Sequence, residues 1–229
     1  MLKGDLRKKQ ILDTAEKLFC LNGYEATSVQ DILDMLHLSK GSFYHHYESK
    51  ESLLSCICEN RAAASADEEK QKGAMLSGID GVNRILSAMI PFNGEGLHFL
   101  KMILPVFSLP EGQTVRNRYQ NALKQAFSPL LLQAFDSAVA AQEVFFDDAA
   151  FTAGVCLDLV NDMWVSISDR MLVSASGPDE NKEPVELLFL LDQYRKVLER
   201  VLMAPFGSLN LIGLEDLNRL RQEINAEKR

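Results

Sequence analysis

The sequence predicts an all-α fold, and three observations support this expectation. Its 229 residues include only 13 glycines and 7 prolines, so few residues interrupt helices. Apolar residues recur at helical spacing, as in Ile11, Ala15, Leu18 and Phe19, which stand at i, i+4, i+7 and i+8. No segment shows the clear alternation of apolar and polar residues that is typical of a half-buried strand.

Turn and capping signals divide the chain into helices. Gly23 can end the first helix with a positive φ, and Thr27 with Gln30 has the spacing of a capping box for the second. A joint is expected over 71–81, where Gly73, Gly78 and Gly81 cluster. The predicted helices cover 6–22, 27–37, 39–47, 50–72, 82–90, 96–108, 114–141, 148–174, 183–203 and 214–227.

Composition narrows the class of protein. No apolar run reaches the length of about 18 residues that suggests a membrane span, so no membrane partner is expected. The first ten residues lack the apolar stretch of a secretory signal, which favours a cytoplasmic location. Cys56 and Cys58 are separated by one residue, which is not the spacing of a zinc or redox pair. We therefore expect all four cysteines to be reduced thiols.

The net charge of −8 taken alone argues against a nucleic-acid partner, but the charge is unevenly distributed. Residues 1–60 contain 7 Lys and Arg against 9 Asp and Glu, whereas residues 61–229 contain 17 against 23. The first ten residues form a small basic arm with Lys3, Arg7, Lys8 and Lys9. Because binding to DNA requires a basic surface only locally, the total charge does not exclude it.

Residues 27–50, TSVQDILDMLHLSKGSFYHHYESK, have the pattern of a helix-turn-helix. In the second short helix, Phe43 and Tyr47 stand four residues apart and are expected to face inward. The outward face carries no acid, and it consists of Lys40, Gly41, Ser42, Tyr44 and His45, with His46 at its edge.

This outward face has the chemistry of a surface that reads the major groove. Lys40 can donate to guanine or to phosphate, and Gly41 allows the backbone to approach the DNA closely. Ser42, Tyr44 and His46 can donate to phosphate oxygens. Lys50, at the start of the next helix, is expected to act with that helix's free N–H groups as a phosphate clamp.

Other site chemistries lack support in the sequence. Neighbouring histidines on a helix diverge by about 100°, and no cysteine or carboxylate cluster accompanies His45 and His46, so no metal site is expected. We find no nucleophile–base set and no phosphate-binding loop. The sequence therefore predicts neither an enzyme nor a cofactor.

The motif resembles the TetR family of transcriptional regulators. The similarity covers about residues 6–60 and includes Gly23-Tyr24, Thr27-Ser28-Val29 and the run from Leu38 to Leu54. It implies a DNA-binding domain over 1–60, with the motif at about 28–50, and a helical effector-binding and dimerisation domain over 61–229. The resemblance implies DNA contacts from Thr27, Ser28, Gln30, Ser39, Lys40, Gly41, Ser42, Tyr44, His45, His46 and Lys50. One departure is the acidic second helix, where Asp31 and Asp34 are expected to face solvent and weaken phosphate attraction.

The resemblance also implies an effector pocket and a homodimer formed through the helices near 148–174 and 183–203. Both helices are apolar around much of their circumference, which fits one core face and one partner face, although a buried monomer core would look similar. Asp158 and Asp162 beside Trp164 would favour a cationic ligand if they faced a pocket, but such a pair is also typical of a solvated face. The candidate lining residues are Phe99, Met102, Phe107, Tyr119, Phe127, Asp158, Asp162, Met163 and Trp164, of which the apolar ones fit ordinary core equally well.

We therefore expect a repressor that binds a palindromic double-stranded DNA operator as a dimer. A small apolar or cationic effector would release it. The alternative is a DNA-bound interaction protein that has no small-molecule effector. Residues 209–229 are expected to form an additional amphipathic helix, whose role the sequence leaves open.

Overall fold

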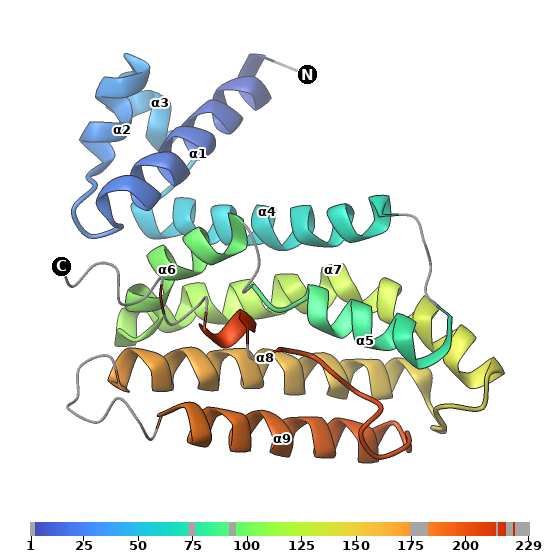
Figure 1. The fold of residues 1–229 in the computed structure, drawn as a ribbon. Helices are drawn as coiled ribbons and strands as arrows, with labels where there is room; N and C mark the ends of the chain where they lie inside the picture. Colours follow the sequence, from blue (N-terminus) through green and yellow to red (C-terminus); the bar gives the residue numbers. More distant parts are fainter. Residues whose placement is uncertain are drawn as a thin grey trace. The chain divides into compact units, whose positions relative to one another are not determined.

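The computed structural model describes residues 3–72, 77–91, 95–174, 183–213, 215–218 and 222. Within these ranges the chain forms helices and no strand, which confirms the all-α prediction (Figure 1). The elements are α1 (Lys3–Asn22), α2 (Val29–Leu36), α3 (Lys40–Tyr44), α4 (Lys50–Gln71), α5 (Gly78–Ala88), α6 (Glu95–Phe107), the 3-10 turn η1 (Pro110–Gly112), α7 (Gln113–Ala140), α8 (Ala149–Ser174) and α9 (Glu183–Val201). Of the predicted helix over 214–227, only 215–218 and 222 are described, and they are helical.

The chain divides into two compact units. The first contains Met1–Ala62 and His98–Ala122, and the second contains Ala63–Leu97 and Leu123–Arg229. The first unit therefore includes most of α6 and the start of α7, which the sequence analysis grouped with the C-terminal domain. Helices α4 and α7 each contribute residues to both units.

In the first unit, the apolar stripe of α1 is the inner face that the sequence predicts. Arg61 of α4 forms an ion pair with Glu16 of α1, and its guanidinium lies 5.7 Å from the ring centroid of Phe99 on α6. The fully buried residues of this unit include Ile11, Ala15, Phe19, Ile32, Leu33, Phe43, Leu53, Leu54 and Ile57. This packing holds the helix-turn-helix against α1.

In the second unit, α8 and α9 lie side by side with opposite chain directions (Figure 1). The stretch Ala149–Met171 is long and apolar enough to cross a membrane, but 50% of it is buried inside the protein. Its inner residues, such as Met163 and Trp164, are fully buried. Trp164 donates its indole N–H to Asn161 Oδ1 at 3.1 Å, so the polar atom of this core residue is satisfied. We therefore interpret α8 as the central helix of a bundle.

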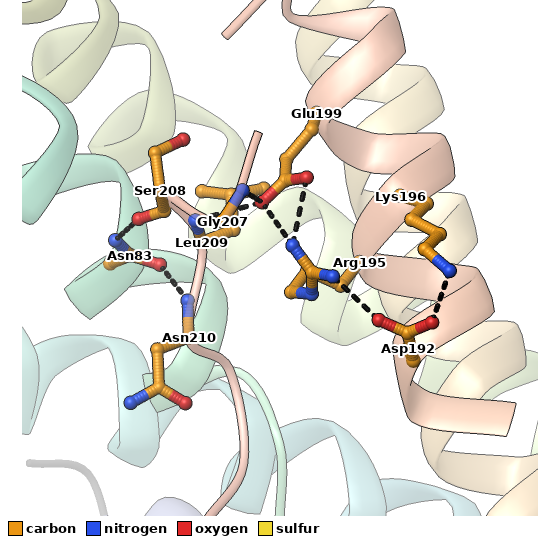
Figure 2. A network of polar contacts seen from close by, with 9 residues as sticks. All are labelled: Asn83, Asp192, Arg195, Lys196, Glu199, Gly207, Ser208, Leu209 and Asn210. Carbon is orange, nitrogen blue, oxygen red and sulfur yellow. Dashed lines mark hydrogen bonds and ion pairs between the residues drawn. The ribbon is translucent and has the colours of Figure 1, made fainter. Parts of the chain in front are cut away.

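The segment after α9 folds back onto helices of the same unit, and we call residues 207–210 the strap (Figure 2). The buried carboxylate of Glu199 on α9 accepts the backbone N–H groups of Gly207 and Leu209 and also binds Arg195. On α5, the Asn83 side chain donates to Ser208 O at 2.8 Å and accepts from Asn210 N at 2.7 Å. The strap thereby connects α5 with α9 without being helical itself.

Helix α5 begins earlier than predicted, within the stretch expected to be a joint. Its N-terminal N–H groups are satisfied by residues distant in sequence: Ser137 Oγ accepts from Gly78 N at 2.9 Å, and Glu143 Oε2 accepts from Ile79 N at 2.7 Å. Ser77 holds the N-cap position but makes no side-chain capping bond. The start of α5 therefore depends on tertiary contacts rather than on a local cap.

Candidate nucleic-acid interface

Helix α2 starts with a complete capping box, one residue later than the sequence predicts. Ser28 Oγ accepts from Asp31 N at 3.2 Å, and Asp31 Oδ2 accepts from Ser28 N at 2.7 Å. The Ser28 hydroxyl, which donates to Asp31 Oδ2, and the Ser28 backbone N–H together hold the pKa of the Asp31 carboxyl below its usual value. Asp31 is exposed to solvent, as expected. Its negative charge also stabilises the N-terminus of α2.

A tight turn then directs α3. His37 adopts the left-handed conformation with φ of 53°, and Leu38 N donates to Leu33 O at 2.9 Å. Ser39 caps the next helix, because its Oγ accepts from Ser42 N at 3.4 Å. The two helices and the turn thus form the predicted helix-turn-helix.

Helix α3 and the turn that follows it through Tyr47 have one buried and one exposed side. Phe43 and Tyr47 are buried, as predicted, and the Tyr47 hydroxyl donates to Lys8 O in α1 at 3.1 Å. Tyr44 is 58% exposed. Lys40, Gly41 and His45 are also exposed, whereas Ser42 and His46 are half-buried. The predicted outward residues therefore share one accessible surface that has no acid on the helix itself.

Thr27 departs from the prediction. It is neither the N-cap of α2 nor an exposed donor, because its side chain is 1% exposed. Its hydroxyl donates within the protein to Gly23 O at 2.9 Å and to Leu18 O at 3.3 Å. A DNA contact from the Thr27 side chain is therefore excluded in this conformation. The local signal in the sequence could not distinguish Thr27 from Ser28, since both can cap a helix.

The remaining polar residues of α2 are exposed, but they are engaged with one another. Gln30 Nε2 donates to Asp34 Oδ1 at 2.7 Å, and the Ser28 hydroxyl donates to Asp31 Oδ2 at 2.7 Å. Exchange of these bonds for DNA contacts would require the side chains to rearrange.

Lys50 lies at the start of α4, as expected, but its ammonium group already has partners. Nζ donates to Tyr24 O at 2.9 Å and to Thr27 O at 3.1 Å, and it lies 4.1 Å from the centroid of the Tyr24 ring. The ammonium group of the predicted phosphate clamp is therefore engaged by the protein itself.

The apolar residues suggested for an effector pocket are all buried, but they belong to different units. Phe99, Met102, Phe107 and Tyr119 lie in the first unit. Phe127, Met163 and Trp164 lie in the second. Within the first unit, the ring centroids of Phe99 and Phe107 are 5.6 Å and 6.2 Å from that of Tyr119.

Asp158 and Asp162 do not accompany these buried residues. Both are exposed on α8: Asp158 forms an ion pair with Lys124 at 2.5 Å, and Asp162 accepts a hydrogen bond from the Tyr194 hydroxyl. A cationic ligand was expected only if these carboxylates faced a pocket, and the structure places both on the surface instead.

Across the part of the chain that the structure describes, no group of three or more His, Cys, Asp or Glu side chains is placed to hold a metal ion. The rings of His45 and His46 contact each other edge to face, with centroids 4.9 Å apart.

A capped helix-turn-helix that presents an acid-free helix face, on an all-α chain, defines the class of helix-turn-helix transcriptional regulators. The family described as bacterial regulatory proteins of the tetR family matches residues 11–56. This match covers the helix-turn-helix and indicates a TetR-family transcriptional regulator.

Relatives and solved structures agree with this assignment. The chain is 25% identical over 169 residues to the repressor KstR2 of Rhodococcus jostii, which covers 70% of this chain and 78% of the relative. It is 30% identical over 104 residues to the negative regulator IcaR of Staphylococcus epidermidis, covering 45% and 55%. It is 28% identical over 116 residues to the uncharacterised regulator YerO of Bacillus subtilis, covering 49% of this chain but only 40% of that relative.

Among solved structures, a TetR-family regulator from Mesorhizobium loti aligns with a TM-score of 0.56 at 15% identity, covering 88% of this chain and 98% of the other. GusR of Salmonella enterica aligns with a TM-score of 0.51 at 19% identity, covering 89% and 99%. At these identities the similarity shows a shared fold only.

Proposed function

We propose that this regulator is a cytoplasmic repressor that binds a palindromic operator as a homodimer through α3. The observation that supports the proposal most strongly is the exposed, acid-free face of α3, which the capping bonds of Ser28 and Ser39 hold in place. Lys40 and Tyr44 are exposed donors on it, one for a guanine edge or phosphate and the other for phosphate.

The homodimer is proposed to form through α8 and α9. Apolar side chains remain exposed on α9, with exposed fractions of 40% for Leu188, 66% for Phe189 and 39% for Val197. Val155 and Leu159 on α8 are only half-buried. A face of this kind is typical of a helix that has a core side and a partner side.

Repression is proposed to end when a small effector binds among the central helices. Since Asp158 and Asp162 lie at the surface, we favour an apolar effector over a cationic one. Binding would shift the population toward a conformation whose recognition helices no longer fit successive major grooves. Native mass spectrometry of the purified protein, followed by DNA release with any molecule found, tests this part.

Selection of DNA from a random pool tests operator binding. We expect a palindrome whose half-site centres are about 34–36 Å apart, since one recognition helix of each protomer must enter a major groove. The double variant Lys40→Ala with Tyr44→Ala should lose specific binding and keep its far-UV circular dichroism spectrum. Lys70→Ala, which removes the same charge from the second unit, is the matched control. Retention of operator affinity by the double variant would refute the proposed surface.

A further inference from the structure

The ammonium group of half-buried Lys50 makes three contacts with the protein itself. Two backbone carbonyls, of Tyr24 and Thr27, accept from Nζ at 2.9 Å and 3.1 Å. The ring of Tyr24 provides a cation–π contact at 4.1 Å. Because an ammonium group has three N–H donors, the two carbonyls already occupy most of its hydrogen-bonding capacity.

The two carbonyls belong to the turn that joins α1 to α2. Gly23 opens this turn with φ of 86°, and Thr27 closes it, one residue before the N-cap of α2. The Tyr24 ring packs edge to face on Phe19 of α1, with centroids 5.1 Å apart. Lys50 therefore connects the first residue of α4 to the turn that sets where α2 begins.

A phosphate contact would compete with these bonds. To reach a DNA backbone with all its donors, the ammonium would have to leave two charge-assisted hydrogen bonds and the face of an aromatic ring. The same bonds stabilise the free protein, because they add to the other hydrogen bonds of the turn, which come from the Thr27 hydroxyl and from the backbone N–H groups of Gly23 and Thr27. The observations therefore favour an internal role for Lys50.

We infer that Lys50 is a positioning residue for DNA recognition. It fixes the Tyr24–Thr27 turn, and through this turn the α2–α3 pair, rather than neutralising a phosphate. The inference rests on the proposed DNA-binding function. The Lys50–Tyr24 contact is the link that orients the recognition surface.

Salt dependence separates the two roles. Loss of a phosphate contact makes the slope of log K against log salt concentration less negative by about 0.9, whereas loss of a positioning contact lowers affinity without changing the slope. The Tm of the DNA-free protein gives a second readout, because only an internal tie stabilises the protein when DNA is absent.

The experiment compares Lys50→Met with the full-length wild-type protein on the selected operator. We expect a Tm lower by about 4 °C or more, an operator affinity lower by roughly tenfold and an unchanged salt slope. A slope that is less negative by about 0.9 overturns the inference whatever the Tm. An unchanged Tm or an unchanged affinity overturns it as well.

Two further variants keep the test decisive. Tyr24→Leu retains the lysine charge and removes the ring, so it should lower Tm and affinity with the same slope even if Lys50→Met does not fold. If Tyr24→Leu behaves as wild type, the tie through the ring is refuted. Lys17→Met removes a charge from an exposed position of α1 and should leave the Tm unchanged.

Failure of the proposed function is distinguishable from failure of the inference. A wild-type protein that selects no DNA contradicts operator binding and, with it, the positioning role for recognition. The Tm of Lys50→Met would then still report whether the tie itself stabilises the turn.

Discussion

At the residue scale, a substitution of Gly41 should affect protein stability and DNA binding differently. A Cβ at this position would meet only Ser39 Oγ at 3.9 Å, so the protein has room for alanine. Gly41→Ala should leave the free energy of unfolding unchanged or raise it by up to about 1 kcal/mol, since alanine favours helix. Operator affinity should nevertheless fall, because the methyl group would stand between the α3 backbone and the groove.

Denaturant unfolding and a DNA titration of the same sample measure these two effects. Gly23→Ala is an informative control, because Gly23 has a φ of 86° with open space around it. There the cost should appear in stability, at about 1 kcal/mol or more. A Gly41→Ala protein that is stable and binds the operator with wild-type affinity would contradict a close approach at this residue.

The burial of some individual residues could be predicted from the sequence, whereas the contacts of others could not. The inward positions Phe43 and Tyr47 followed from helical periodicity, which depends only on neighbours in the chain. The burial of Thr27 did not follow, because it depends on the carbonyls of Leu18 and Gly23. The hydrogen bond from Lys50 to the Tyr24 carbonyl spans 26 positions in the chain, so it could not be predicted from the sequence either.

At the element scale, the strap between α5 and α9 depends on a buried carboxylate. Glu199 is 3% exposed and accepts from two backbone N–H groups as well as from Arg195. Glu199→Ala would leave all three donors without this partner, and we expect a loss of about 3 kcal/mol in the free energy of unfolding. Urea denaturation followed by circular dichroism measures this loss.

The control for Glu199 comes from the same helix. Lys196 forms an ion pair with Asp192 near the surface of α9, so Lys196→Ala should leave the denaturation midpoint close to that of the wild type. Equal losses in the two variants would show that the strap contributes no more than a surface ion pair.

At this scale, some helix boundaries could be predicted from the sequence and others could not. The ends of α1 and α9 lie close to the predictions, because periodic apolar residues stop there. Helix α5 begins at Gly78, where two glycines discourage helix locally. Its start is stabilised by Ser137 and Glu143, and no pattern within residues 71–81 contains that information.

At the scale of the whole molecule, two buried thiols report on the two compact units. Cys58 lies in the first unit and Cys156 in the second, and both are buried. Burial raises the pKa of both thiols, to about 12 for Cys156, so the reactive thiolate is scarce near neutral pH. Exposed Cys20 should therefore react first with a disulfide reagent in the native protein.

Pulsed alkylation of the two buried thiols in increasing urea tests whether the two units unfold together. Because α4 and α7 each contribute to both units, we expect Cys58 and Cys156 to become reactive at the same urea concentration. Peptide mass spectrometry of the labelled protein measures both midpoints. Labelling of Cys58 at a clearly lower concentration would mean that the DNA-binding unit unfolds on its own.

The strap also has a consequence for the exchange of amide hydrogens with solvent. The N–H groups of Gly207, Leu209 and Asn210 lie beyond the end of α9, yet side chains accept hydrogen bonds from all of them. Amides in such a non-helical segment ordinarily exchange quickly, because opening requires little unfolding. Here deuterium uptake should be slow in the wild type and fast in Asn83→Ala at Asn210. Slow exchange at these few amides outside the helices would thus indicate that the second unit is folded.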